Sequence, residues 1–309
     1  MAENYGLPYT GSKSRIAHWV IDQLPRGRVL IDAFAGGCAI THRALLIQKW
    51  QTVIANDINF KYPQLFADAV RGKYRDEKRW ISREDFERLK SQYAFVACCW
   101  SFSNNLNSYV YSKDIEPYKR ALHYAIVLDD FAPMQELMPE VSQAVADAIH
   151  WQNSLHDRRI TAQNVIVKKL KLLTGDNYAH QIIQGNPLYQ SIRHTNRNTP
   201  SLESLESLER LRVTSLSYDE IDIPADAVVY CDPPYHDRDK KLYECTASSF
   251  DHCAFYDWCV RVSKTNPIFI SEYSIEDDRF EVVAEKQKMM RMSQFKSSIV
   301  TERLYTVKK

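Results

Sequence analysis

The tetrad Asp232-Pro233-Pro234-Tyr235 places an acid, two stiff residues and an aromatic ring directly after the apolar run 227–231. That run reads as a buried strand. A proline pair cannot continue strand pairing, so the carboxylate and the phenol are expected at a rigid strand end. In an open α/β sheet, ligands bind at such ends. The acid can accept from an amine while the ring stacks, which suits a flat amino-bearing group such as a nucleic-acid base. The alternative is a strand followed by a ligand-free proline turn.

A second candidate site is the glycine pair Gly36-Gly37, which follows a predicted strand over 29–34 and precedes a helix predicted over 39–50. The chain has only eight glycines, and two of them meet at this turn. Glycines here let a ligand approach backbone N–H groups at a helix start. The turn is neither the longer dinucleotide fingerprint nor a phosphate loop, and a tight turn without a ligand remains open.

Asp57 stands at the end of the next predicted strand, 51–55. It lies about 20 residues after the glycine turn, where α/β cofactor domains commonly place an acid on a ribose diol. The alternative is a cap for the following helix. Near the start of the chain, Gly11-Ser12 predicts a tight turn with Ser12 as helix cap, from which Tyr9 and Lys13 project. A capping loop without a ligand is the alternative there.

The remaining predicted strands follow a long interruption of the sheet pattern, from about residue 61 to about 210. The sequence therefore predicts a sheet domain formed by 1–60 and 211–309, with an inserted domain at 61–210. Residues 121–150 are periodic and helical. The strands expected after the insert are 211–214, 227–231, 267–271 and a terminal pair, 280–284 and 303–307, that closes the sheet antiparallel.

The insert holds the candidate residues for a polyanion partner. Net charge is only +1, so such a partner must be met by a local patch. Residues 157–200 carry seven basic residues against Asp157 and Asp176, interleaved with amides that can read bases. A solvated surface is the alternative. Asn104 and Asn105 lie in an aromatic and amide-rich stretch that suits either bases or a core. The basic candidates are Arg158, Arg159, Lys168, Lys169, Lys171, Arg193 and Arg197.

The composition is that of an ordinary globular protein, with 45% hydrophobic and 26% charged residues over 309 positions. No run reaches the length of a membrane span, and the first residues lack a signal pattern. Seven cysteines without a Cys-x-x-Cys pair suit a reducing compartment. We therefore expect a cytoplasmic protein without a metal site.

In its order of motifs, namely the glycine turn, the insert and Asp-Pro-Pro-Tyr, the chain resembles the Dam-type DNA adenine-N6 methyltransferases. The likeness runs from Tyr9 to Tyr235 and, by general pattern, through 271–273 and 302–305. It implies an α/β fold, a Rossmann-like methyltransferase sheet with an inserted, mainly helical target-recognition domain. It also implies S-adenosylmethionine as cofactor, a specific double-stranded DNA sequence as substrate, and base flipping with direct in-line transfer to the adenine amino group. A cognate restriction endonuclease is a partner that the class admits, whereas nothing indicates an obligate protein partner or a membrane.

The resemblance also assigns roles to residues. The Asp232 carboxylate and the Pro233 carbonyl would hold the amino group of the target adenine, with Tyr235 stacked on its ring and Pro234 completing the catalytic motif. In two places the sequence departs from the family pattern. Cys38 stands where a third glycine is usual, and Ser217 stands where an acid often precedes the aromatic residue that contacts the cofactor adenine. The implied cofactor set is Tyr9, Lys13, Asp32, Phe34, Gly36, Gly37, Asp57, Tyr218 and Asp232.

Three other functions compete with this interpretation. A methyltransferase of the same fold could act on RNA or on the amino group of cytosine. A nucleic-acid-binding relative could have kept the fold and lost transfer, for which Ser217 is the only hint. The sequence gives little support to a metal-dependent nuclease, because Asp237, Asp239 and Asp251 do not form an evident metal-ligand pattern with the nine histidines.

Overall fold

A computed structural model describes residues 5–7, 9, 11–74, 76–102, 105–152, 154–174, 209–235, 250–293 and 296–309. The chain divides into two compact units. Unit 1 comprises Met1–Gly72 and Thr195–Lys309, and unit 2 comprises Lys73–His194. Unit 1 thus extends beyond the predicted boundary at residue 60 and includes α3 (Lys61–Val70), which contacts β3 (Leu211–Thr214). The sequence pattern places that helix in the insert, but its buried Leu65 and Phe66 make it part of the sheet domain.

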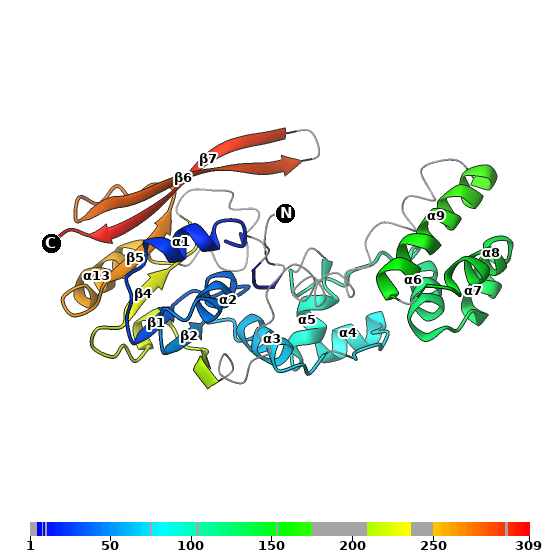
Figure 1. The fold of residues 1–309 in the computed structure, drawn as a ribbon, viewed down its shortest axis with the longest axis horizontal. Coiled ribbons are helices and arrows are strands. Elements are labelled where there is room, and N and C mark those ends of the chain that lie inside the picture. Colours follow the sequence, from blue (N-terminus) through cyan, green and yellow to red (C-terminus); the bar gives the residue numbers. More distant parts are fainter. Residues whose placement is uncertain are drawn as a thin grey trace. The chain divides into compact units, whose positions relative to one another are not determined.

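The described part of unit 1 is built on a seven-stranded sheet with the order β3-β2-β1-β4-β5-β7-β6 (Figure 1). Strands β3, β2, β1, β4 and β5 run parallel, and β7 and β6 add an antiparallel pair at one edge. The predicted α/β fold class and the antiparallel closure are confirmed. The strands not yet bounded are β1 (Val29–Asp32), β2 (Thr52–Asn56), β4 (Val228–Cys231), β5 (Ile268–Glu272), β6 (Phe280–Ser293) and β7 (Lys296–Val307).

Helices cover both faces of this sheet. α13 (His252–Val262) buries Phe255, Trp258 and Cys259 in one cluster with residues of β1, β4 and β5. α2 (Ala39–Leu46) contacts β1 and β2, and α1 (Ala17–Gln23) packs against α2. Every residue of β1 and of β4 is therefore buried, which explains the continuous apolar runs in the sequence.

The described part of unit 2 is mainly helical. Its core joins Leu122, Met134, Val145 and Ile166 from different helices. The helical pattern predicted over 121–150 is confirmed, although it is divided where Asp129 adopts a positive φ of 58° and where Pro133 and Pro139 begin new helices. The helices are α4 (Arg83–Leu89), α5 (Ala94–Cys99), α6 (Glu116–His123), the π-helix η2 (Tyr124–Leu128), α7 (Ala132–Leu137), α8 (Pro139–Ile149) and α9 (Leu155–Thr174).

One local prediction is wrong. Ser12 does not cap a helix, because α1 begins only at Ala17, after Ile16. The Ser12 hydroxyl instead accepts from the backbone N–H of Ser14 at 3.2 Å and shapes the turn before the helix. None of the described helices is both long enough and apolar enough to cross a membrane.

Candidate active site

The glycine turn and the proline tetrad leave neighbouring strands at the same edge of the sheet. Strands β1 and β4 are parallel, with Asp32 opposite Tyr230. The pairing continues one residue further, where the Ala33 N–H donates to the Tyr230 carbonyl at 2.9 Å. Asp232 follows two residues after Tyr230, so the acid and the turn lie side by side at the carboxyl ends of β4 and β1.

The glycine turn is shaped by the N-terminal segment that crosses it. The Leu7 N–H donates to the Gly37 carbonyl at 2.6 Å. A Cβ at Gly37 would lie 2.6 Å from the Tyr9 Cβ, and one at Gly36 would lie 2.9 Å from the Tyr9 Cε1. Only residues without a side chain let Tyr9 lie this close to the turn. The structure thus brings three of the predicted cofactor residues together.

Cys38, the first departure from the family pattern, adopts the left-handed conformation with φ 60° and ψ 32°. Glycine reaches this conformation at no steric cost, whereas other residues are strained in it. The position therefore keeps the backbone geometry of a glycine while carrying a buried thiol, whose Sγ lies 3.7 Å from the Gly36 carbonyl oxygen.

Asp57 ties the end of β2 to the glycine turn. One carboxylate oxygen accepts from the Gly36 N–H at 2.8 Å and the other accepts from the Asn59 N–H at 2.8 Å. Burial raises the pKa of Asp57, and these two N–H groups oppose the shift. The following helix begins after Phe60 with no side-chain cap, so the alternative of Asp57 as a helix cap is excluded.

Asn56 is a residue of this edge that sequence reasoning did not select. Its side-chain amide donates to the carbonyls of Ala33 and Leu216, each at 3.0 Å. Its side-chain oxygen accepts from the Thr214 hydroxyl at 2.8 Å and the Leu216 N–H at 3.0 Å. One buried side chain therefore fastens the ends of β1, β2 and β3. The sequence feature that could have pointed to Asn56 is a polar residue at the end of a predicted buried strand.

Asp32 is 1% exposed and accepts at one carboxylate oxygen from the Thr41 N–H at 3.1 Å and the Thr41 hydroxyl at 2.7 Å. Burial raises its pKa to about 7; the hydrogen bonds from Thr41 oppose this shift, and the nearby charges of Asp232 and Asp57 contribute to it. Three carboxyl groups thus share this edge. Their field disfavours a phosphate-bearing ligand and suits one with positive charge and hydroxyl donors.

Lys13, predicted as a cofactor contact, lies on the proline tetrad. Its ammonium contacts the Asp232 Oδ1 at 2.7 Å, donates to the Tyr235 hydroxyl oxygen at 2.5 Å and lies 4.6 Å from the centre of the Tyr235 ring. Burial lowers the pKa of Lys13, but the charges of Asp232 and Glu302 outweigh it, so the net shift is upward. Lys13 is therefore a buried ammonium.

Tyr235 is held from two further sides. Its hydroxyl donates to the Glu302 Oε1, and its ring meets the edge of Tyr273 with centroids 4.6 Å apart. Burial, Asp232 and Glu302 all raise its pKa, which keeps the phenol neutral. Glu302 is not among the predicted site residues, although it belongs to the 302–305 pattern that the resemblance includes.

Phe34 and Tyr218 also come together, stacked with centroids 5.7 Å apart and planes at 29°. Phe250 and Phe255 surround the pair. Ser217, the second departure, forms a capping box with Glu220 on the short helix η3 (Tyr218–Glu220) and donates its hydroxyl to Asp219. The serine therefore shapes the turn that presents Tyr218.

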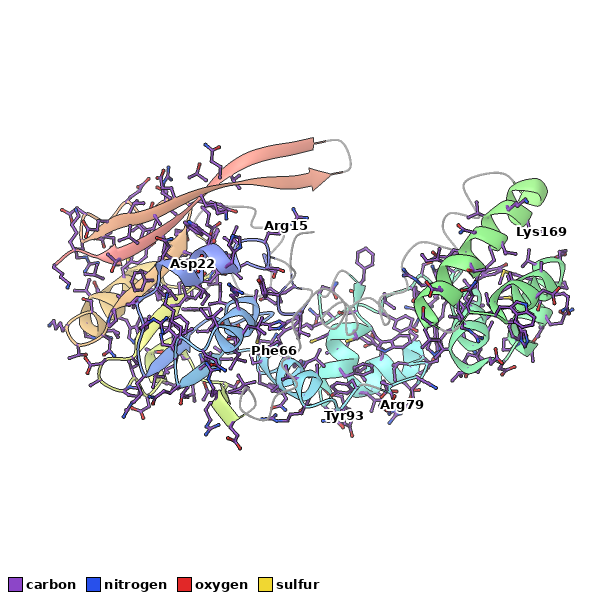
Figure 2. The ribbon with its side chains drawn as sticks, in the orientation of Figure 1. Arg15, Asp22, Phe66, Arg79, Tyr93 and Lys169 are labelled. Carbon is purple, nitrogen blue, oxygen red and sulfur yellow. The ribbon has the colours of Figure 1, made fainter. Side chains whose placement is uncertain are left out.

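The predicted DNA contacts whose side chains the structure describes lie in unit 2 and differ in accessibility. Arg158 pairs with Asp129 and also donates to the Ala125 carbonyl at 3.1 Å, and Arg159 is only 8% exposed. Contacts within the protein thus hold Arg158, and burial encloses Arg159, although both side chains were expected to reach phosphates. Lys168 and Lys169 are exposed on α9, and Figure 2 labels Lys169 on that helix.

Most of the other predicted DNA contacts fall outside the part of the chain that the structure describes. Lys171 belongs to α9, but its side chain lies outside the described residues, as do Asn104, Arg193 and Arg197. The exposed Asn105 uses its side-chain oxygen to accept from the N–H groups of Asn107 at 3.0 Å and Ser108 at 2.9 Å. Asn105 therefore shapes a turn.

Comparison with known proteins adds an independent finding. The profile of the D12 class N6 adenine-specific DNA methyltransferases matches residues 9–297. A type II methyltransferase, M2.HphI of Haemophilus parahaemolyticus, is 39% identical over 67 residues. That match spans 21% of this chain and 19% of the relative. Since the profile covers the glycine turn, unit 2 and the proline tetrad in one continuous match, the chain belongs to the D12 class N6 adenine-specific DNA methyltransferase family.

Proposed function

We propose that this protein transfers a methyl group from S-adenosylmethionine to the N6 amino group of adenine in a specific sequence of double-stranded DNA. The observation that carries the proposal is the adjacency of the acid-lined glycine turn after β1 and the Asp232–Tyr235 tetrad after β4. Membership of the family supports the same reaction.

The residues of the glycine turn fit the cofactor. When bound, S-adenosylmethionine supplies a methyl group made electrophilic by its sulfonium. Asp32 and Asp57 would receive its ammonium and ribose hydroxyls, since each carboxylate oxygen can accept more than one hydrogen bond. Gly36 and Gly37 keep the backbone open beneath Tyr9, and the Phe34–Tyr218 pair would contact the adenine ring of the cofactor.

The tetrad would orient the target base. The lone pair of an adenine amino group is delocalised into the ring and is a poor nucleophile. Hydrogen bonds from that group to the Asp232 carboxylate and the Pro233 carbonyl would make the nitrogen more pyramidal and aim its lone pair at the methyl carbon. Transfer of the cofactor's methyl group to this nitrogen would leave one surplus amino proton, which would pass to solvent. Catalysis rests on positioning and electrostatics.

Unit 2 would recognise the DNA. The target base must leave the duplex to reach the tetrad, and stacking on Tyr235 would offset part of the lost base stacking. Exposed Lys168 and Lys169 would contact phosphates. The likeness to a type II methyltransferase supports a restriction-modification setting.

The test is direct. Purified protein is incubated with duplex DNA and methyl-labelled cofactor, and the nucleosides are separated and identified by mass. N6-methyladenine is expected. N4-methylcytosine, or label in RNA alone, would contradict the proposal.

Asp232→Ala serves as the catalytic control. It should abolish transfer while leaving duplex binding largely intact, because the removed carboxylate acts on the target amino group and not on phosphates. Wild-type turnover by this variant would refute the role given to Asp232.

A further inference from the structure

Glu302 is a fully buried carboxylate in the middle of the candidate active site. It is 0% exposed on β7, and its Oε1 lies 3.4 Å from the Lys13 ammonium and accepts a hydrogen bond from the Tyr235 hydroxyl. It lies beyond residues 9–297, which the family profile matches. A buried charge is retained only where it is paired.

The donors and acceptors of this cluster have a fixed direction. An ammonium can only donate, so the Tyr235 oxygen accepts from Lys13 and its own proton must point to Glu302. Lys13 thus lies between two carboxylates, at 2.7 Å from Asp232 and at 3.4 Å from Glu302. Asp232, the nearer of the two, is the carboxylate that binds the amino group of the target adenine in the proposed reaction.

We infer that Glu302 is a positioning residue that holds Lys13 when the target amino group binds Asp232. This inference rests on the proposed function. In the structure the ammonium and an incoming amino group would compete for the Asp232 carboxylate. Glu302 gives the ammonium a second anionic partner through a small shift, with Tyr235 as the shared contact. Without Glu302, a Lys13 ammonium that had left Asp232 would be a poorly paired buried charge, which is unfavourable.

The test compares Glu302→Gln with the wild-type protein on a duplex whose methylated site has been mapped by modified-base sequencing. The single-turnover methylation rate should fall about tenfold to a hundredfold, the range expected for loss of a hydrogen bond to a charged group. Affinity for S-adenosylmethionine should stay within about threefold of the wild-type value, because Asp32 and Asp57, which would bind the cofactor, are unchanged. Glu285→Gln is the matched control, since it removes an ion pair with Arg303 from the same hairpin outside the site. It should keep the wild-type rate.

A second measurement separates positioning from a merely structural role. Binding is compared for duplexes with adenine or with unsubstituted purine, which lacks the amino group, at the target position. Glu302→Gln should weaken binding of the adenine duplex more than binding of the purine duplex, because only adenine must displace Lys13 from Asp232. Equal weakening of both, or joint loss of rate and cofactor affinity, would overturn the inference.

The outcome is also distinct from failure of the proposed function. If Asp232→Ala is inactive and Glu302→Gln keeps wild-type rate and preference, only the role of Glu302 fails. If Asp232→Ala remains active, the proposed function itself fails. Should Glu302→Gln not fold, Glu302→Asp keeps the buried charge but shortens its reach. It should lower both the rate and the adenine preference, and wild-type values for it would overturn the inference.

Discussion

Asp32, Asp57 and Asp232 are three carboxyl groups at one sheet edge, and each is held by different partners. Asp32 accepts from Thr41, Asp57 accepts from Gly36 and Asn59, and Asp232 faces the Lys13 ammonium. Of these acids, Asp232 contacts a buried cation and Asp32 has its pKa raised to about 7. These different environments lead us to expect different responses to pH and substitution.

We expect the affinity for S-adenosylmethionine to rise as pH increases from about 6 to about 8. The pKa of Asp32 is raised to about 7 by burial, so below that pH the group is mostly neutral, and a cationic ligand favours its ionised form. Calorimetry in buffers of different ionisation enthalpy should show proton release on binding near pH 6. Asp32→Asn should bind more weakly and without this dependence. A wild-type affinity that does not change with pH would contradict the prediction.

The same shift affects stability without cofactor. The unfolded chain loses the Asp32 proton near pH 4, whereas the folded chain keeps it until about pH 7. The folded state therefore binds more protons between these values, and the contribution of Asp32 to stability falls as pH rises through this window. Urea unfolding should show that Asp32→Asn removes this part of the slope. An unchanged slope would show that Asp32 titrates normally.

Gly37→Ala should disturb the cofactor turn. Its added Cβ would lie 2.6 Å from the Tyr9 Cβ and 2.8 Å from the Leu7 carbonyl oxygen, which is backbone. We expect a loss of about 2 kcal/mol of stability, as for overpacking, and weaker cofactor binding, measured by thermal unfolding and calorimetry. Gly27→Ala, whose nearest neighbour would be the Val228 Cγ2 at 3.3 Å, is the milder control. Equal behaviour of the two variants would argue against a special role of the turn.

At the scale of elements, the apolar runs predicted β1, β2, β4 and β5 to within one or two residues because the residues of these strands are buried or half-buried on both faces. The β6–β7 hairpin is longer than predicted. The charged residues Glu285 and Lys286 follow the predicted end of β6 and interrupt its apolar pattern, although the pairing with β7 continues through them. Glu302 was missed for another reason. Its contact with Tyr235 spans 67 residues and depends on how the tetrad after β4 meets the interior of β7.

Arg210 joins the returning chain to α2. Its guanidinium donates to the Trp50 carbonyl at 2.6 Å and 3.1 Å and to the Leu45 carbonyl at 3.0 Å. Arg210→Ala should therefore lower the free energy of unfolding by about 2 kcal/mol, measured in urea, with little change in the transfer rate. The control Arg212→Ala removes an exposed side chain that donates only to the nearby carbonyls of Glu209 and Leu211 among its described bonds. It should cost less than about 0.5 kcal/mol. Equal losses in the free energy of unfolding for the two variants would show that the Arg210 contacts with the Leu45 and Trp50 carbonyls do not stabilise the fold.

At the scale of the whole molecule, a net charge of +1 provides no general attraction to DNA. Binding must come from local charge, and the exposed lysines of α9 in unit 2 are the described candidates. The sequence indicated this basic segment, but it could not show that Arg158 and Arg159 are engaged by packing, because those contacts depend on how the helices of unit 2 meet.

The double variant Lys168→Gln/Lys169→Gln should reduce the slope of log affinity against log salt by about 2, roughly one for each phosphate that is no longer neutralised. The weakening should be similar for all duplex sequences, as measured by fluorescence anisotropy at several salt concentrations. Lys264→Gln, an exposed lysine of unit 1, is the control. A double variant with the wild-type slope would remove these lysines from the interface.

The fastening of three strand ends by Asn56 has a consequence for biosynthesis. Its partner Thr214 is 158 residues further along the chain. During translation, β1 and β2 leave the ribosome long before their neighbours β4 and β3. The strand edges that pair with these neighbours therefore stay unpaired while the whole of unit 2 is synthesised. Contacts of such long range slow folding. A nascent chain halted before residue 209 should therefore be readily degraded by protease in its first 72 residues, and release of the full chain should protect them.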